Sequence, residues 1–380
     1  MRKIRILARI SQVGNCGVGW YRQVSPLQQL AKKGKIDLKV IDFNWGEKPV
    51  VEPYKMHFNF PEFKGIEDID KKFYEAFEWA DIVYLTRDES MPFVAAHAGL
   101  REYFKQKGYK KKLIVDIDDY VQFTRPHNPG YLSFHPGSSY NKMNLKLLNI
   151  VDGVTCSTDY LKKVYKNENK KIFVCPNSLD IEWRDKYLNT KPIVKKKKDE
   201  IRIGWAGSAG HYENLKVLHR PVLEILKKYK NVTFHYTGLF GDLFEYNEFK
   251  NRIRKVKFVD LKKWPEHLKA MDLDIAIAPL ADNHFNRGKS NLRVLEYWAA
   301  KYPVIASPVE PYKFIKNGKD GILAMEEYEI LNAMEELINN PDKRDKLAQA
   351  GYNRLNKEYN VSENCNIWLN ALTKLNKTSK

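Results

Sequence analysis

The sequence predicts an α/β protein of two domains, each built on a parallel β-sheet covered by helices. Short apolar runs bounded by turn residues alternate with helical patterns, as in strands linked by crossover helices; examples are 4–10, 113–117 and 273–280. A chain of 380 residues is also long enough for two hydrophobic cores. We expect domains at 1–190 and 201–358, a Lys-rich linker at 191–200 and a final helical segment at 359–380.

Composition indicates a folded and strongly basic protein. Hydrophobic residues make up 43% of the chain and it contains eight tryptophans, which argues against global disorder. The formal net charge is +18, with +8 in residues 1–190 and +10 in the remainder. Such a charge favours polyanionic partners, namely an anionic membrane, an acidic glycan or nucleic acid. The alternative is that a general abundance of lysine in the source organism's proteins produces this net charge without any such partner.

The sequence carries no signal for a membrane span or for secretion. No run of 18 apolar residues occurs, and residues 1–10 are too short and too charged to be a signal peptide. The four cysteines, Cys16, Cys156, Cys175 and Cys365, have neither disulfide nor metal-ligand spacing. Because this usage suits reduced thiols, we expect a cytoplasmic protein.

Two glycine-rich turns follow predicted strands, one in each domain. Gly14-Asn-Cys-Gly17-Val-Gly19 precedes a helix at 20–33, and Gly207-Ser208-Ala-Gly210-His211 follows the strand that begins at Ile201. Glycine lets backbone approach a ligand closely, and the N–H groups at a helix start attract anions. We therefore select Gly17, Gly207 and Ser208 as phosphate contacts and His211 as a catalytic or phosphate contact. Arg22 is either a ligand-facing residue or a solvated one.

Three carboxylates end the buried-type strand at 113–117. They are Asp116, Asp118 and Asp119, of which we select Asp118 and Asp119 as catalytic candidates. Closely spaced acids either bind a divalent cation through oxygen ligands or orient and deprotonate a substrate hydroxyl. Aspartates at a strand end also form turns and cap helices, so all three interpretations stay open at this point.

The segment 286–308 carries the strongest site signal. An apolar strand at 273–280 leads through a polar loop to a helix at 291–300, for which Ser290 is the expected N-cap. The N–H groups of such a helix start and its dipole favour an anion, to which Arg287 and Lys289 add charge and Asn291 a donor. Glu296, two turns into the helix, is placed to accept hydrogen bonds from a diol such as ribose. The segment therefore predicts a site for a nucleoside diphosphate.

The residue pattern of this segment also resembles that of a known family. Leu295-Glu296-Tyr-Trp-Ala-Ala-Lys-Tyr-Pro303-Val-Ile-Ala-Ser307 is similar to the pattern LEAMAxGxPVVAS of retaining GT-B glycosyltransferases, especially glycosyltransferase family 4 and its relatives. Pro176-Asn177-Ser178-Leu-Asp180 resembles their PNGxD segment, with Ser178 in place of glycine. A second glutamate that the family often has eight positions before Glu296 is Gly288 here, whereas a subgroup has the Lys-Ser pair seen at Lys289-Ser290.

The resemblance implies two Rossmann-like domains facing across a cleft, with a last helix that crosses back onto the first domain. It implies a glycosyltransferase that uses a nucleotide-diphosphate sugar, retains the anomeric configuration and needs neither a metal nor another cofactor. The arginine and lysine that the family often supplies in the second glycine loop are not visible, so we expect Lys289 and Arg287 to contact the diphosphate instead. In this fold Asp118 and Asp119 are expected to face an acceptor hydroxyl.

The acceptor is open at the level of sequence. A cell-surface or lipid-linked glycan, handled by a cytoplasmic protein that is peripheral at the inner membrane face, is the first expectation. A hydroxymethylated base in DNA, as used by some viral glycosyltransferases of this fold, is the alternative that the charge also suits. A non-catalytic protein that binds a nucleotide sugar or a glycan is a third, because the first glutamate is missing.

Overall fold

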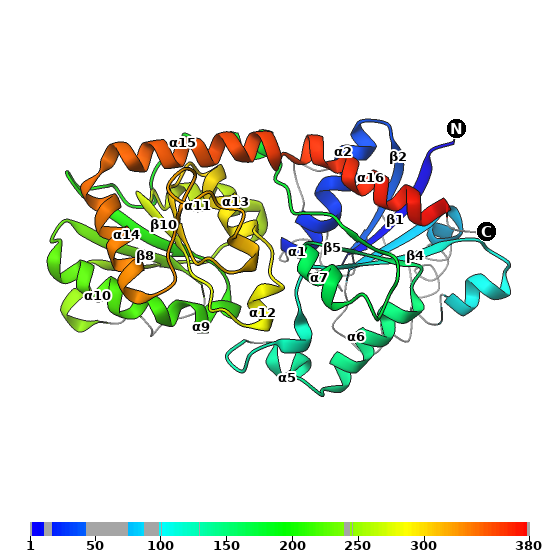
Figure 1. Ribbon diagram of the computed structural model, residues 1–380. Helices are drawn as coiled ribbons and strands as arrows, with labels where there is room; N and C mark the ends of the chain where they lie inside the picture. The colour runs from blue at the N-terminus through cyan, green and yellow to red at the C-terminus, as the bar shows by residue number, and fades with distance from the viewer. Residues whose placement is uncertain are drawn as a thin grey trace, which may run out of the picture. The chain divides into compact units, whose positions relative to one another are not determined.

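The computed structural model describes residues 2–10, 17–42, 75–86, 99, 101–128, 130–238, 244 and 246–377. The chain divides into two compact units (Figure 1). Unit 1 comprises residues 1–122, 133–178 and 361–380, and unit 2 comprises residues 123–132 and 179–360. The N-terminal part of the first glycine turn, residues 14–16, lies outside the described residues.

Unit 1 contains a six-stranded parallel sheet in the order β2-β1-β3-β4-β5-β6. Its strands are β1 (Ile4–Ile10), β2 (Ile36–Asp42), β3 (Ile82–Thr86), β4 (Lys112–Ile117), β5 (Gly153–Cys156) and β6 (Ile172–Val174). Its helical elements are α1 (Gly17–Gly19), the π-helix η1 (Trp20–Val24), α2 (Ser25–Lys32), η2 (Val121–Phe123), α5 (Tyr131–Phe134), α6 (Ser139–Ile150), α7 (Asp159–Val164) and α16 (Val361–Lys377). Parallel strands joined by crossover helices form the predicted Rossmann-like arrangement.

The C-terminal helix α16 belongs to unit 1 and packs against α2, although more than 300 residues separate the two in sequence (Figure 1). Its apolar face is buried through Cys365, Trp368 and Leu372. The Trp368 indole Nε1 donates a hydrogen bond of 3.1 Å to the Arg22 carbonyl oxygen. The C-terminal helix α16 therefore folds as part of the same unit as the N-terminal strands and helix α2.

Unit 2 contains a second six-stranded parallel sheet, in the order β12-β11-β10-β7-β8-β9. Its strands are β7 (Ile201–Ala206), β8 (Val232–Thr237), β9 (Ile253–Val256), β10 (Ile275–Ala278), β11 (Val304–Ala306) and β12 (Ile322–Leu323). Its α-helices are α8 (Ile181–Asp185), α9 (Tyr212–Leu215), α10 (His219–Lys228), α11 (Trp264–Ala270), α12 (His284–Arg287), α13 (Leu292–Ala299), α14 (Glu327–Asn339) and α15 (Pro341–Glu358). Single 3₁₀ turns complete it: η3 (Ala209–His211), η4 (Lys216–Leu218), η5 (Asn247–Phe249), η6 (Leu261–Lys263) and η7 (Glu310–Tyr312).

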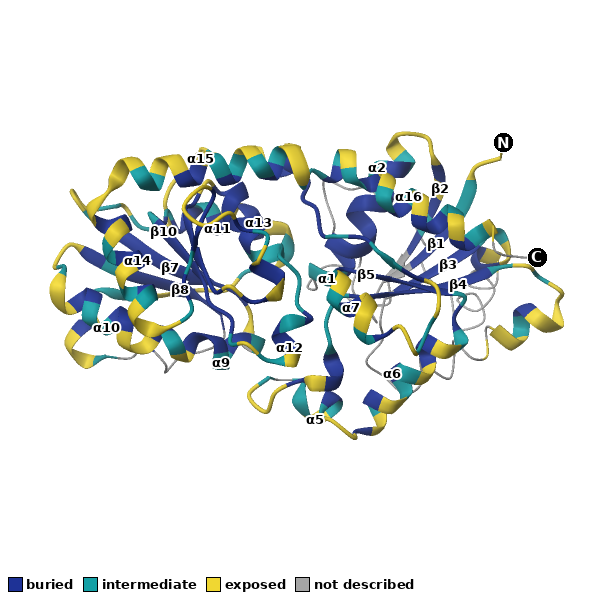
Figure 2. Cartoon of the chain, in the orientation of Figure 1, coloured by how far each residue is buried: buried dark blue, intermediate teal, exposed yellow. Residues whose placement is uncertain are grey.

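Each unit has its own hydrophobic core between its sheet and its helices. Figure 2 shows the strands as buried and the outward surfaces of the helices as exposed. In unit 2, α10 and α14 pack together over the sheet, burying Ile225, Leu226, Met334 and Leu337. The burial of such side chains is the main favourable contribution to folding of each unit.

Three local features differ from the expectations. The strand expected at 256–259 lies at Ile253–Val256, because Ile253 pairs with Phe234 of β8 and packs partly buried against the core of unit 2. The single helix expected at 20–33 consists of a π-helical turn followed by α2. The division of the chain falls at residues 178 and 179, so residues 179–190, which we expected in the first domain, lie in unit 2 with segment 123–132.

Candidate active site

The candidate site lies in unit 2, in loops that follow strands β7 and β10. Since all strands of this sheet are parallel, the loops at their carboxyl ends gather at one edge, where α/β sheets bind ligands. The loop after β7 carries Gly207, Ser208 and η3, and the stretch after β10 carries α12 and the start of α13. Ser307, after β11, accepts a 3.0 Å hydrogen bond at Oγ from Leu280 N and so ties a third loop to this edge.

Arg293 is the central cation of this edge, and the sequence analysis missed it. Its guanidinium carbon lies 5.1 Å from the ring centroid of Trp205, the penultimate residue of β7, and its Nη2 lies 3.0 Å from His211 Nε2. A Cβ at Gly207 would be only 2.4 Å from Arg293 Nη1, so only glycine allows the guanidinium to pass so close to this loop. The signal available in sequence was a basic residue in the first turn of the helix that follows Lys289-Ser290.

His211 is a neutral, buried partner of Arg293. Burial lowers the pKa of the imidazole well below its usual value, and the charges of Arg293 and Lys289 lower it further. Both ring nitrogens face N–H donors, Nε2 that of Arg293 at 3.0 Å and Nδ1 that of Asn214 at 3.1 Å, and the neutral ring accepts from one of them. The geometry gives His211 the task of holding Arg293, and its expected catalytic role stays a prediction.

Two buried amides lock the loops after β7 and β10 together. Asn214 Oδ1 accepts hydrogen bonds from Ala281 N, at 3.0 Å, and from Asn286 Nδ2, at 2.6 Å. Asn286 Nδ2 also donates to the Ala281 carbonyl oxygen at 2.9 Å, and Asn214 Nδ2 lies 3.1 Å from His211 Nδ1. Such satisfied buried networks fix side-chain positions before any ligand arrives.

The predicted cations differ in their surroundings. The Lys289 ammonium lies 4.4 Å from the ring centroid of Phe285, and its charge acts on His211. Arg287 instead forms an ion pair with Asp282, with contacts of 2.6 and 2.9 Å. The Arg287 hydrogen bond lowers the pKa of the Asp282 carboxyl. Lys289 thus belongs electrostatically with Arg293 and His211, whereas Arg287 is paired on the surface.

The expectation that Ser290 is the N-cap of the following helix is wrong. Helix α13 begins at Leu292, and Asn291 occupies the N-cap position without a side-chain capping hydrogen bond. The Asn291 carbonyl oxygen accepts from the N–H groups of Val294 and Leu295. The helix therefore starts one residue later than expected.

Glu296 is a buried carboxylate with two partners in unit 2. Its Oε1 accepts a 2.9 Å hydrogen bond from Trp264 Nε1, of α11, and a 3.3 Å bond from Arg184 Nη2, of α8. The Glu296 residue is 8% exposed and Arg184 is 4% exposed. Removing the carboxylate would leave a buried guanidinium without its counter-ion, so Glu296 has a structural task beside any contact with ribose.

The acids of unit 1 separate into two kinds. Asp116, in β4, is buried in a two-point ion pair with Arg22, with both contacts at 2.9 Å, and also accepts from Thr155 Oγ1 at 2.6 Å. Arg22 also bonds the carbonyl of Cys175 and Asn177 Oδ1, so neither of its two predicted roles, ligand-facing or solvated, is correct. Asp118 and Asp119 follow the strand and are only partly buried.

Gly17 stands at the start of α1, where a Cβ would lie 3.3 Å from the Tyr21 ring.

No helix among the described residues is long and apolar enough to cross a membrane. In the same part of the chain, His, Cys, Asp and Glu side chains form no group of three or more suited to a metal ion.

Comparison with known proteins agrees with this architecture. Residues 218–370 match the family model described as glycosyl transferase-like. The chain has the GT-B fold. No curated protein matches the sequence. The segment that matches this family model includes Glu296 and every residue from β10 through α13, but it excludes the loop after β7.

Solved structures of this fold align over nearly the whole GT-B chain. Sucrose-phosphate synthase from Thermosynechococcus elongatus has a TM-score of 0.68 at 13% identity, covering 98% of this chain and 99% of that one. A glycosyltransferase from Rickettsia africae has a TM-score of 0.66 at 15% identity, with 100% of both chains covered. HepE from Anabaena, solved with UDP and glucose, has a TM-score of 0.64 at 14% identity, covering 97% and 99%.

Proposed function

We propose that this protein is a glycosyltransferase that moves a sugar from a nucleoside-diphosphate sugar to an acceptor hydroxyl. The observation that carries the proposal is Arg293, which lies over Trp205 and is held by His211 beside the glycine loop. A guanidinium fixed in this way is suited to two-point binding of phosphate oxygens. Lys289, whose charge acts on the same histidine, adds a second cation.

These cations have a direct task in catalysis. When the glycosidic bond of the donor breaks, negative charge grows on the leaving diphosphate. Fixed cations stabilise that charge without needing to reorganise during the reaction. In this proposal Arg293 and Lys289 contact the diphosphate, the backbone at Gly207 and Ser208 approaches it, and Glu296 binds the ribose hydroxyls. Transfer with retention and without a metal is proposed from the resemblance to family 4.

The acceptor that we propose is a cell-surface or lipid-linked glycan, handled at the cytoplasmic face of an anionic membrane. A net charge of +18 supports attraction to such a surface. The same charge also suits DNA, so a hydroxymethylated base is the second candidate. Affinity for duplex DNA that falls steeply with salt, together with transfer to a hydroxymethylated oligonucleotide, would favour the second candidate.

The first experiment is a thermal-shift panel of UDP, GDP, ADP, CDP and TDP sugars. A ligand that binds only the folded state raises the melting temperature by mass action. UDP-glucose is tested first, because HepE was solved with UDP and with UDP-glucose. We expect one nucleotide to raise the melting temperature, and that donor then enters a transfer assay. No rise with any of them, at millimolar concentration, would contradict the proposed donor site.

A further inference from the structure

The buried ring of His211 faces a hydrogen-bond donor at each of its two nitrogens. Arg293 Nη2 lies 3.0 Å from Nε2, and Asn214 Nδ2 lies 3.1 Å from Nδ1. Burial and the charges of Arg293 and Lys289 lower the pKa of the ring well below its ordinary value, so the ring is neutral and carries one proton. Because only one nitrogen of a neutral ring can accept, His211 cannot satisfy both donors at once.

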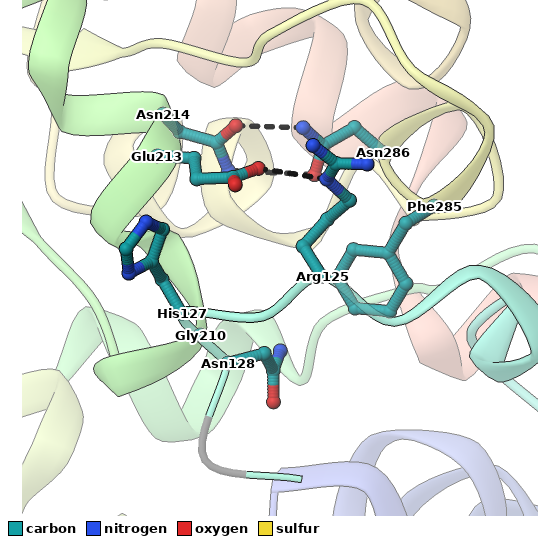
Figure 3. A pocket seen from close by; sticks show the side chains of 8 residues that line it. All are labelled: Arg125, His127, Asn128, Gly210, Glu213, Asn214, Phe285 and Asn286. Atoms are coloured by element: carbon teal, nitrogen blue, oxygen red, sulfur yellow. Dashed lines mark hydrogen bonds and ion pairs between the residues drawn. The ribbon is translucent and has the colours of Figure 1, made fainter. Parts of the chain in front are cut away.

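The backbone of Ala281 fixes the orientation of the Asn214 amide. A backbone N–H only donates, so the Asn214 atom that lies 3.0 Å from Ala281 N is the amide oxygen. A carbonyl oxygen only accepts, so the Asn286 atom that lies 2.9 Å from Ala281 O is Nδ2, which also donates to Asn214 Oδ1 at 2.6 Å. Figure 3 shows the two amides meeting, with a dashed line for the bond between them. The Asn214 nitrogen therefore faces the His211 ring, and the amide cannot turn over without losing both bonds.

In the ligand-free protein the ring accepts from the charged donor. A charge-assisted hydrogen bond is roughly twice as strong as one between neutral groups, so Nε2 accepts from Arg293 and the ring proton is on Nδ1. That proton then points at the N–H group of Asn214, so two donors face each other. The arrangement holds Arg293 in place at the cost of the contact with Asn214.

A bound diphosphate changes which nitrogen should accept. The phosphate oxygens replace Nε2 as acceptors for the Arg293 guanidinium, which binds them at two points. The lone pair of the ring is then better placed at Nδ1, where Asn214 Nδ2 donates to it. One proton leaves Nδ1 for water and one is taken up at Nε2, so the ring stays neutral. The new Nε2–H group points toward Arg293 and hence toward the phosphate that Arg293 binds.

We propose that His211 is a tautomeric switch set by Asn214, which holds Arg293 in the free protein and donates a hydrogen bond from Nε2 to the diphosphate of the bound donor. Asn214 is then a positioning residue, and His211 is a further donor to the leaving group beside Arg293 and Lys289. The inference rests on the proposed function, because it requires a diphosphate at Arg293. A fixed donor of this kind stabilises the negative charge that grows on the leaving group.

The direct test is ¹⁵N NMR of the full chain with labelled histidine, because protonated and unprotonated nitrogens of a neutral ring have different chemical shifts. The chain has nine histidines, and the signals that disappear in His211→Gln assign this ring. The probes are UDP and inorganic pyrophosphate, of which the second carries a diphosphate without a base. Thermal shift with the same probes shows independently whether each one binds.

We expect the Nδ1–H tautomer in the free protein and the Nε2–H tautomer at saturating UDP or pyrophosphate. Binding with an unchanged tautomer, or with an imidazolium in the bound state, would overturn this inference and leave the donor site standing. If neither probe raises the melting temperature at millimolar concentration, the proposed donor site fails and this inference fails with it.

Asn214→Asp reverses the polarity of the group that faces the ring. One carboxylate oxygen can still accept from Ala281 N and Asn286 Nδ2, while the other accepts from Nδ1 and keeps the ring proton there. We expect UDP to bind about tenfold more weakly than to the wild type at pH 8, because Nε2 no longer donates. The carboxylate also raises the pKa of the ring, so the ratio of variant to wild-type affinity should rise at lower pH, where the imidazolium donates from both nitrogens.

The matched control is the same substitution in a protein that lacks the ring. The added negative charge repels a diphosphate by itself, so Asn214→Asp is also made in the His211→Gln background. There the affinity ratio should lose its pH dependence, because no imidazole titrates, and the two substitutions should be non-additive. An equal loss of affinity with equal pH dependence in both backgrounds would assign the effect to charge alone and overturn the role of Asn214. The tautomer measurement on the wild type decides the proposal if Asn214→Asp does not fold.

Discussion

Replacing Glu296 tests the structural and the ligand-binding tasks of one side chain. In the Glu296→Ala variant, Trp264 Nε1 loses its acceptor and the buried Arg184 loses its counter-ion. Breaking a buried ion pair by removing one partner costs about 3–5 kcal/mol. For a folding unit the size of unit 2, 1 kcal/mol corresponds to about 2–4 °C in melting temperature, so we expect a fall of about 6–20 °C.

The conservative variant separates the two tasks. Glu296→Gln keeps an amide oxygen that can accept from Trp264 but removes the charge that faces Arg184. Its melting temperature should therefore lie between those of the wild type and Glu296→Ala. If Glu296 also binds ribose hydroxyls, both variants should bind the donor nucleotide about tenfold or more weakly, as measured by calorimetry well below their melting temperatures.

Two results would refute this reasoning, each a different part of it. An unchanged melting temperature for Glu296→Ala in differential scanning calorimetry would show that the ion pair with Arg184 does not stabilise unit 2. A lowered melting temperature with unchanged nucleotide affinity of the folded protein would show that Glu296 is structural only. Because Glu296 has buried partners in Trp264 and Arg184, we expect a loss of stability beside any loss of nucleotide affinity.

Three further predictions concern other parts of the molecule. Arg293→Ala should weaken nucleotide binding by about 10- to 100-fold, as expected for the loss of a charge-assisted hydrogen bond. The affinity of Arg293→Lys should lie between those of Arg293→Ala and the wild type. Equal affinities of Arg293→Ala and the wild type in calorimetry would contradict the proposed diphosphate contact. Asp116→Ala, which leaves the buried Arg22 guanidinium without the carboxylate that balances its charge, should cost unit 1 about 3–5 kcal/mol in urea unfolding, and a midpoint within error of wild type would contradict it. Burial, followed by the charge of Arg202, lowers the pKa of His235 to about 4 from its ordinary value of 6.5, so the unfolded chain binds the proton first and stability should fall as pH decreases from about 6.5 to 4. His235→Gln should flatten that part of the pH–stability profile, whereas an unchanged profile would assign it to other groups.

The sequence by itself determined the fold class and the location of the loops that we propose bind the donor. Alternating strand and helix patterns depend on local periodicity, which the chain carries in every segment, so both parallel sheets and most strand positions were predictable. The segment from Lys289 to Ser307 likewise identified the loop, helix and strand that follow β10. Glycine spacing located the loop after β7 in the same way, because the close approach that it permits is encoded by one residue type.

Only the tertiary structure decided which side chains meet. Arg293 is one of many basic residues in sequence, and it becomes the central cation because Trp205 and His211, more than 80 residues earlier, lie against it. Arg22 resembles a solvated helix residue until Asp116, Asn177 and Trp368 surround it. The ion pair between Arg125 and Glu213 joins segments 88 residues apart. Periodicity gives the face on which a side chain lies, but its partner depends on how the elements pack, and that is a non-local property of the fold.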